Sequence, residues 1–273
     1  MTCSSETLKR ARPLLGTIVE IGVIPSTTES FAHEIIHRAF DSIELIHSLM
    51  SRFDPCSEVS QLNEMRIGEQ MGVSTHVMRV MRTAFDVEQA TLGAFTITPS
   101  APRDTLGSTA LAIITSDSIQ RIGMGSIDFG GIAKGYAVDE AIHVLKSSDI
   151  RTGYVNAGGD VRAFGEPHSV LVRNPEKLGE SVVSIDLVDR ALATSANYSI
   201  DQNTDQSGII LDKLEEKPVS SRASASVIAR SCMVADALAK AVLIGRSKMS
   251  SVLERYDARG LVVQGGRIDT YPN

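Results

Sequence analysis

The chain has 273 residues, of which 42% are hydrophobic and 22% are charged, an ordinary composition for a globular protein that buries a substantial core. Its formal net charge of −6 argues against nucleic acid or an anionic membrane surface as the main partner. A negative body with a local positive pocket still suits a nucleotide.

The three cysteines, Cys3, Cys56 and Cys232, provide neither a disulfide framework nor a pair with metal-site spacing. No apolar segment typical of a signal peptide precedes Cys3. We also find no run of about 18 apolar residues that would span a bilayer. The sequence therefore predicts a cytoplasmic protein without a membrane span.

Residues 1–13 are polar and basic, and we expect a loose N-terminal segment there. The β-branched residues of 16–24 predict a strand. Apolar residues at three- and four-residue spacings over 29–50 predict a long helix, with Thr28 as its N-cap. His33, His37 and His47 lie on this helix. The spacing of the first two would suit a metal, but solvent-facing histidines are the favoured interpretation of this pair.

The rest of the chain alternates between strand and helix patterns without a linker or a low-complexity tract. A strand or short helix is expected over 106–115, and a strand over 118–129. Further helices are expected at 57–63, 75–93, 134–147 and 232–244, and further strands at 154–156, 169–173, 182–186 and 261–263. This mixture predicts an α+β or α/β fold.

The segment 127–139, Ile-Asp-Phe-Gly-Gly-Ile-Ala-Lys-Gly-Tyr-Ala-Val-Asp, is the most informative part of the sequence. Its order predicts a strand, a tight turn and a helix N-terminus, where unpaired N–H groups and the helix dipole favour an anion such as a nucleotide pyrophosphate. Lys134 would add a positive charge, and Asp128 would bind a ribose or a cation. On spacing alone, an ordinary turn is the favoured interpretation of the two glycines.

Other segments accompany this one in a fixed order. They are 12–17, 50–55, 57–63, the second Gly-Gly-Asp segment at 153–162, Ala-Thr-Ser at 193–195 and Ala-Asp-Ala-Leu-Ala at 235–239. Together they resemble the ApbE family, the FAD:protein FMN transferases, from about Leu14 to Gly245. The resemblance implies one domain over 14–273, with an ApbE-like fold of two related α/β halves and FAD between them.

The resemblance also implies a reaction, in which FMN passes from FAD to a Thr or Ser of an acceptor protein and AMP is released. The residues that it places near FAD are Leu15, Phe53, Phe95, Asp128, Gly130, Lys134, Thr194 and Ile209. For Leu15 and Phe53 an ordinary core position is the alternative. Thr194 would otherwise simply end a strand.

In relatives Mg²⁺ is held by a backbone carbonyl of the glycine segment and by the Asp and Thr of an Ala-Asp-Ala-Leu-Ala-Thr helix. Gly131 and Asp236 match two of these positions, but Lys240 stands where the threonine is expected. An ammonium offers no oxygen ligand, which makes Mg²⁺ binding doubtful. Either the Lys240 ammonium replaces the metal charge on the pyrophosphate, or Lys240 and Asp236 form a plain helix salt bridge. Retained Mg²⁺ binding is a third interpretation.

The positions that carry chemistry in relatives are altered here. Gly208 replaces the histidine expected as general base, and Thr96 replaces an aspartate. Lys240 and Asp160 are therefore the candidate catalytic residues, with Asp160 either orienting the acceptor or capping a turn. Four functions are weighed. They are an active transferase, a non-catalytic FAD-binding relative that serves as carrier, sensor or assembly partner, a FAD pyrophosphatase and, least favoured, a protein that binds no flavin.

Overall fold

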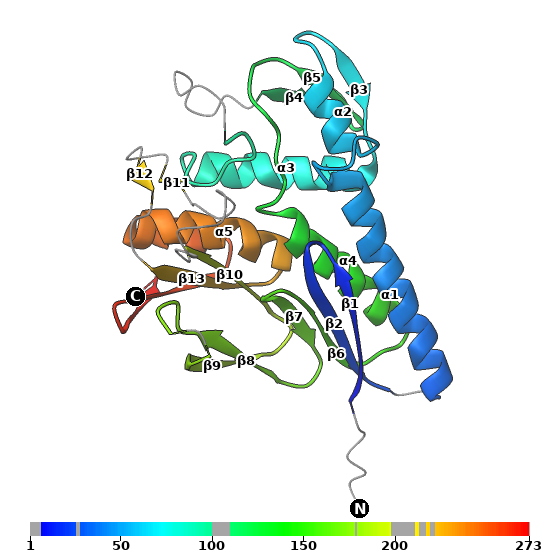
Figure 1. Cartoon of the computed structure of the whole chain (residues 1–273), viewed down its shortest axis with the longest axis vertical. Coiled ribbons are helices and arrows are strands. Elements are labelled where there is room, and N and C mark those ends of the chain that lie inside the picture. Colours follow the sequence, from blue (N-terminus) through cyan, green and yellow to red (C-terminus); the bar gives the residue numbers. More distant parts are fainter. Residues whose placement is uncertain are drawn as a thin grey trace, which may run out of the picture.

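A long antiparallel sheet with helices on one face organises the chain (Figure 1). The computed structural model describes residues 7–25, 28–99, 110–177, 179–197, 211–212, 217–218 and 222–272. Within these residues the sheet has eight strands, and every neighbouring pair is antiparallel. In spatial order they are β1 (Leu8–Leu14), β2 (Thr17–Ile24), β6 (Thr152–Ala157), β7 (Asp160–Phe164), β10 (Ala191–Asn197), β13 (Ala223–Ala229), β14 (Arg259–Gln264) and β15 (Arg267–Tyr271).

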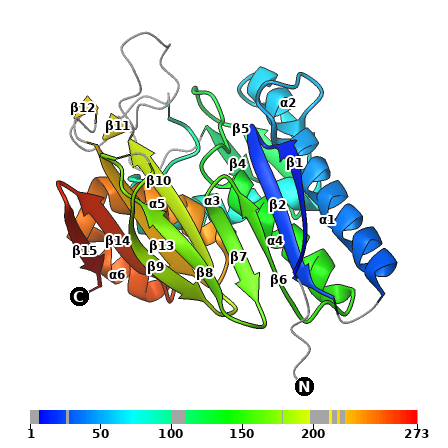
Figure 2. The ribbon, with the colours of Figure 1, turned by 60° about the horizontal axis from the view of Figure 1, so that its bottom comes forward.

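The sheet divides into two halves of four strands (Figure 2). Strands β7 and β10 join them through only two residue pairs, Ala191 with Arg162 and Leu192 with Val161. Helix α4 (Ala133–Ser147) packs on β6 and β7, and α5 (Cys232–Gly245) packs on β10 and β13. The mixed α/β fold predicted from the sequence is confirmed.

Helix α1 (Glu29–Met50) has the bounds that the apolar spacing predicts. Its first turn is closed by the Thr28 hydroxyl, which accepts from Phe31 N at 3.4 Å. Its apolar face packs against α4. Helices α2 (Glu58–Glu64) and α3 (Thr75–Ala90) begin in the same way, at the hydroxyls of Ser57 and Ser74.

The remaining elements lie outside the long sheet. They are the three-stranded sheet β3 (Gln70–Gly72), β5 (Ser118–Arg121) and β4 (Leu111–Ile113); the hairpin β8 (His168–Arg173) and β9 (Ser181–Leu187); the pair β11 (Leu211–Asp212) and β12 (Lys217–Pro218); the 3₁₀ turn at Arg246–Met249; and α6 (Ser250–Arg255). Hairpin β8–β9 covers the sheet face opposite the helices (Figure 2) and closes a second, smaller core.

Three expectations from the sequence are wrong. The segment predicted to be loose is a strand from Leu8 onward, because its backbone pairs with β2 along its whole length. The strand expected over 118–129 ends at Arg121. Strand 261–263 does not close the chain, since β14 is followed by β15.

The backbone between Arg121 and the glycine turn is irregular because its N–H and C=O groups form hydrogen bonds with groups outside any neighbouring strand. Ile127 N donates to the Asn63 side chain at 2.6 Å, and the Ile127 carbonyl accepts from Asn63 Nδ2 at 3.0 Å. Asp128 N donates to the Ile97 carbonyl at 2.8 Å. These contacts fix the approach of the chain to α4 without a sheet ladder.

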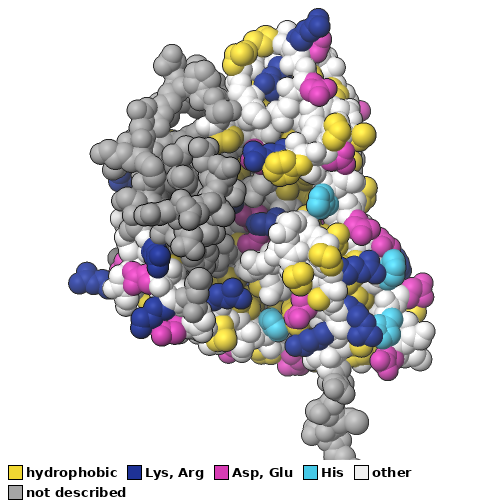
Figure 3. Space-filling model, viewed as in Figure 1, with side chains coloured by type: hydrophobic (Ala, Val, Ile, Leu, Met, Phe, Trp, Pro, Cys, Tyr) yellow, Lys and Arg dark blue, Asp and Glu magenta, His cyan; other side chains and the backbone are white. Residues whose placement is uncertain are grey.

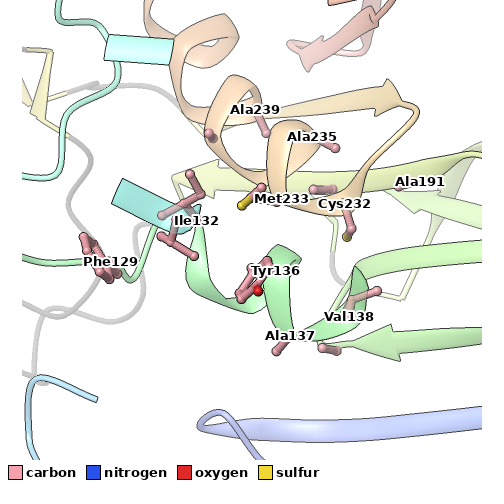
Figure 4. Packing of buried hydrophobic residues seen from close by; sticks show 14 of the residues in the cluster. Phe129, Ile132, Tyr136, Ala137, Val138, Ala191, Cys232, Met233, Ala235 and Ala239 are labelled. Carbon is pink, nitrogen blue, oxygen red and sulfur yellow. The ribbon is translucent and has the colours of Figure 1, made fainter. Parts of the chain in front are cut away.

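Helices α4 and α5 approach each other closely where α4 begins (Figure 4). A Cβ on Gly135 would lie 2.3 Å from the Cys232 carbonyl oxygen, so only glycine fits this crossing. Each helix then receives a carboxylate from the other. Asp236 on α5 accepts from Gly135 N at 3.2 Å, while Asp139 on α4 accepts from Cys232 N and Met233 N at 2.9 Å each. The two helix starts are thereby held in fixed register.

Candidate functional site

A cavity of about 470 Å³ opens between the β1–β2 hairpin, the end of α1 and the start of α4. Its size lies in the range of small-molecule sites. Figure 3 shows this face of the molecule hollowed near its middle, where acidic and basic side chains lie together. The residues that line the cavity are Leu15, Gly16, Ile46, His47, Met50, Ser51, Arg52, Phe53, Asp128, Gly130, Ala133 and Lys134.

Leu15 and Gly16 form the two-residue turn of the hairpin, with positive φ values of 55° and 70°. Leu15 N donates to His47 Nδ1 at 3.3 Å, which ties the turn to α1. Because Nδ1 accepts this bond, the tautomer that fits it carries its proton on Nε2, and His47 is one of the residues that line the cavity. No role in the site is predicted for His47 from the sequence. Its place beside Ile46 and Met50, at the edge of the apolar stripe of α1, was the available signal.

Phe53 is 82% exposed, so the interpretation of this residue as an ordinary core side chain is wrong. The Arg52 guanidinium lies 4.7 Å from the centroid of the Phe53 ring and also contacts Asp128, with Nη1 3.2 Å from Oδ2. Single exposed hydrophobic side chains are common on protein surfaces, so it is the place of Phe53 in the cavity lining that makes its ring a candidate for ligand contact.

The glycine turn itself is not an open anion cradle. Gly130 N donates to Asp128 Oδ1 at 2.7 Å, and Gly135 N donates to Asp236 Oδ2 at 3.2 Å. Ile132 N and Ala133 N both donate to the Phe129 carbonyl. These four N–H groups already have acceptors within the protein, and pyrophosphate binding by this backbone stays a prediction. The positive charge at this end of the cavity comes from side chains.

Those side chains form an alternating chain of charges, which we call the Asp–Lys cluster: Asp160, Lys134, Asp236 and Lys240. Lys134 Nζ lies 2.5 Å from Asp160 Oδ2 and 3.6 Å from Asp236 Oδ2. Lys240 Nζ lies 3.1 Å from Asp236 Oδ1. Both carboxylates are buried, each side chain being 3% exposed, whereas the two lysine side chains are 32% and 30% exposed. The lysine side chains are thus the partly exposed members of the cluster.

The cluster shifts the acidity of its members. Burial, with a contribution from Asp236, raises the pKa of Asp160 to about 6 although Lys134 opposes the shift. For Asp236 burial acts in the same direction, but Lys134, Lys240 and the Gly135 N–H outweigh it and lower the pKa. The pKa of Lys134 is raised, because the two aspartates outweigh the desolvation of its ammonium. Asp236 and Lys134 are therefore held in their charged forms, whereas Asp160 is the carboxyl of the cluster that ionises least readily.

These residues do not fit a magnesium site. Within the described residues, no group of three or more His, Cys, Asp or Glu side chains is placed to hold a metal ion. Around Gly131 the nearest side chain is Lys240, whose ammonium is bound to the Asp236 oxygen that a cation would need. Hard divalent cations require oxygen ligands, and an ammonium is repelled by them.

The other predicted site residues lie away from the cavity lining. Phe95 is 2% exposed and belongs to the main core. Thr194 lies inside β10 rather than at its end, and its Oγ1 is 2.8 Å from Ser226 Oγ. Asp160 begins β7 directly after the Gly158–Gly159 turn, where φ is 65° and 105°, and its carboxylate binds Lys134. Ile209 and Gly208 lie outside the described residues.

A second cavity, of about 410 Å³, also lies along α4 and is lined mainly by polar residues of α3, α4 and the start of α5. Its charges are paired with each other. Arg79 Nη1 lies 3.2 Å from Glu140 Oε1, and Arg162 Nη1 lies 2.6 Å from Asp139 Oδ1. His76 Nδ1 is 2.8 Å from the Tyr136 hydroxyl.

The fold and the site define a mixed α/β protein with a half-apolar cavity whose wall contains Lys134 of the Asp–Lys cluster. A profile of the ApbE family matches residues 15–262, and the chain belongs to this family. The FAD:protein FMN transferase of Vibrio cholerae is 26% identical over 284 residues, which cover 92% of this chain and 85% of that protein. The corresponding protein of Haemophilus influenzae is 22% identical over 296 residues, covering 93% and 86%.

Solved structures give the same result. The flavin transferase ApbE from Vibrio cholerae superposes with a TM-score of 0.77 at 25% identity, covering 97% of this chain and 96% of that one. The ApbE protein from Thermotoga maritima reaches a TM-score of 0.83 at 25% identity, covering 98% and 97%. The resemblance seen in the sequence is confirmed. No helix in the described residues is both long and apolar enough to cross a membrane, and the cytoplasmic location stays a prediction.

Proposed function

We propose that this chain transfers FMN from FAD to a Ser or Thr of an acceptor protein and releases AMP. The observation that carries the proposal is the cavity of about 470 Å³, which has an apolar wall of Leu15, Ile46 and Met50 and ends at Lys134. A ligand with a flat ring system and a pyrophosphate matches both ends. The family membership and the names of the relatives support the same reaction.

The step is a substitution at phosphorus. The acceptor hydroxyl oxygen forms a bond to the FMN phosphorus, and the bond from that phosphorus to the bridging oxygen breaks. The electron pair stays on the AMP phosphate, and the hydroxyl proton is released to solvent or to a base. No other co-reactant is consumed. The negative charge that builds on the departing phosphate has to be stabilised by fixed positive groups.

In this proposal the apolar wall and Phe53 bind one ring system of FAD, and His47 Nε2–H donates to a polar edge of that ring. Asp128 and Gly130 also line the cavity and contact the bound FAD there. Lys134 faces the pyrophosphate. Asp160 is buried behind Lys134 and acts through it, so it is a positioning residue rather than a group that touches substrate.

The test combines binding with turnover. The purified chain is titrated with FAD by flavin fluorescence and then incubated with FAD and an acceptor protein that carries a Ser/Thr flavinylation motif. AMP release together with an acceptor mass increased by FMN is the expected result. AMP and free FMN without an adduct would identify a FAD pyrophosphatase, and tight binding without AMP a non-catalytic FAD-binding relative. Absence of FAD binding would overturn the proposal.

A further inference from the structure

We propose that the Lys240 ammonium takes the place of the divalent cation, so that FMN transfer by this chain does not require Mg²⁺. The inference rests on the proposed function and concerns the charge that acts on the pyrophosphate. Its starting point is the disagreement between the magnesium site that the family resemblance implies and the residues that surround Gly131 and Asp236.

The first argument is the fixed position of Lys240. The residue lies one helical turn after Asp236 on α5, and its ammonium is 3.1 Å from Asp236 Oδ1. Its side chain also runs along Gly131, since a Cβ on that glycine would lie 3.0 Å from Cε, 3.1 Å from Cδ and 3.1 Å from Nζ. Lys240 is therefore held both by an ion pair and by packing, and its ammonium lies beside the glycine turn.

The second argument is that the oxygens a cation would need are already occupied. Asp236 Oδ1 accepts from Lys240, and Asp236 Oδ2 accepts from Gly135 N at 3.2 Å and lies 3.6 Å from Lys134 Nζ. Asp160 Oδ2 accepts from Lys134 at 2.5 Å. A divalent cation entering here would have to displace one ammonium and remain close to the other.

The third argument is functional. Lys134 and Lys240 together place two positive charges around the buried carboxylates, and both side chains are about one-third exposed. An ammonium bound in this way is present in every molecule, whatever the magnesium concentration. It donates hydrogen bonds to phosphate oxygens as a point charge. The reaction stays balanced, since AMP leaves with the electron pair of the broken bond and no metal is exchanged.

The decisive experiment compares turnover in EDTA with turnover in Mg²⁺. The chain is freed of metal, and FAD binding and AMP release with the acceptor are measured at 1 mM EDTA and at about 5 mM Mg²⁺. We expect the AMP-release rates to agree within about twofold. A rate at least tenfold higher in Mg²⁺ would overturn the inference while leaving the proposed transferase intact. Loss of FAD binding in both buffers would instead overturn the proposed function.

Variants at residue 240 test the charge itself. Lys240→Met should lower the AMP-release rate at least about thirtyfold in both buffers, and Lys240→Arg should retain more of it than Met. Lys240→Thr restores an oxygen ligand and should gain a dependence on Mg²⁺ that the parent lacks. Lys248→Met, an exposed lysine just after α5, is the matched control.

Circular dichroism and FAD titration accompany each variant, so that a folding defect is distinguished from a chemical one. A folded Lys240→Met variant with the parental rate in EDTA would overturn the role of the ammonium. So would a Lys240→Thr variant with the same rate in both buffers as the parent.

Discussion

The two cavities along α4 are similar in size but differ in how their charges are arranged. In the second cavity every arginine of the wall is paired with a carboxylate of the same wall, Arg79 with Glu140 and Arg162 with Asp139. Asp139 in addition caps the start of α5. These groups satisfy one another and hold helices together, which leaves little for a ligand to bind.

In the first cavity Arg52 and Asp128 also pair with each other, but an apolar wall and Lys134 line the cavity as well. One wall is apolar and contains an exposed aromatic ring, and Lys134 belongs to a cluster whose carboxylates are buried behind the ammonium groups. A ligand therefore meets hydrocarbon on one side and positive charge on the other. The comparison indicates that the number of charged residues does not define a binding site. What matters is whether one sign of charge remains accessible.

The largest effect is expected from Lys134→Met. The substitution leaves the buried carboxylate of Asp160 without its ammonium and Asp236 with Lys240 alone. We expect a loss of about 3 kcal/mol in the free energy of unfolding, and FAD affinity lower by at least about 100-fold. Urea denaturation and FAD titration measure the two effects. Lys146→Met, which removes a half-exposed lysine of the same helix, should change the free energy of unfolding by less than about 0.5 kcal/mol. If the two variants changed stability and FAD affinity equally, Lys134 in the Asp–Lys cluster would be no more important than an ordinary surface lysine.

The second prediction concerns pH. In the folded chain the pKa of Asp160 is raised from 3.8 to about 6, so between these values the folded state holds more protons than the unfolded state. The contribution of Asp160 to the free energy of unfolding therefore falls as the pH rises through this window. Asp236 does not contribute to the pH dependence in this window, because its pKa is lowered and it titrates below the window.

Urea denaturation of the parent and of Asp160→Asn at about pH 4.5, 5.5 and 7 tests this prediction. We expect the parent to lose stability relative to the variant from the lowest to the highest pH. Parallel curves for the two proteins would show that Asp160 titrates normally, and that burial behind Lys134 does not perturb it.

A smaller effect is expected from Phe53→Ala. Since Phe53 is 82% exposed, its truncation should change the free energy of unfolding by less than about 0.5 kcal/mol. If its ring stacks on FAD, the dissociation constant should rise about five- to tenfold, the loss of one aromatic contact of roughly 1 kcal/mol. Leu171→Ala, at a side chain that is 62% exposed on β8, is the control and should leave FAD binding unchanged. An unchanged dissociation constant in Phe53→Ala would remove this ring from the site.

Much of the fold follows from local patterns in the sequence. Helix α1 has the predicted bounds because Thr28 and an uninterrupted apolar stripe specify it, and α5 lies within a residue of its prediction. The approach to the glycine turn was mistaken for a strand because its backbone partners are the Asn63 side chain and the Ile97 carbonyl. Contacts between segments so far apart in the sequence produce no periodic pattern of apolar residues from which they could be predicted. Strand β1 was missed since its polar residues pair through the backbone, not through an apolar face.

The site was predictable to a similar degree. Leu15, Phe53, Asp128, Gly130 and Lys134 do line one cavity. The salt bridge between Lys240 and Asp236 has the predicted i,i+4 spacing. The contact of Lys134 with Asp160 could not be predicted from the sequence, because it depends on the β6–β7 hairpin, which brings β7 beside α4. His47 was missed for the related reason that its neighbour, the Leu15 N–H, comes from another element.

The smallest effect is expected in the second cavity, and it is the strictest test of the comparison. Arg79 is 63% exposed and pairs with Glu140 on the adjacent helix, so Arg79→Met should change the free energy of unfolding by less than about 0.5 kcal/mol. FAD affinity and AMP release should match the parent within about twofold, because Arg79 lines the polar cavity and not the cavity that contains Lys134. His143→Ala in the same wall should behave alike. A drop of tenfold or more in FAD affinity for either variant would mean that the polar cavity takes part in binding, and that self-paired charges do not mark a structural cavity in this protein.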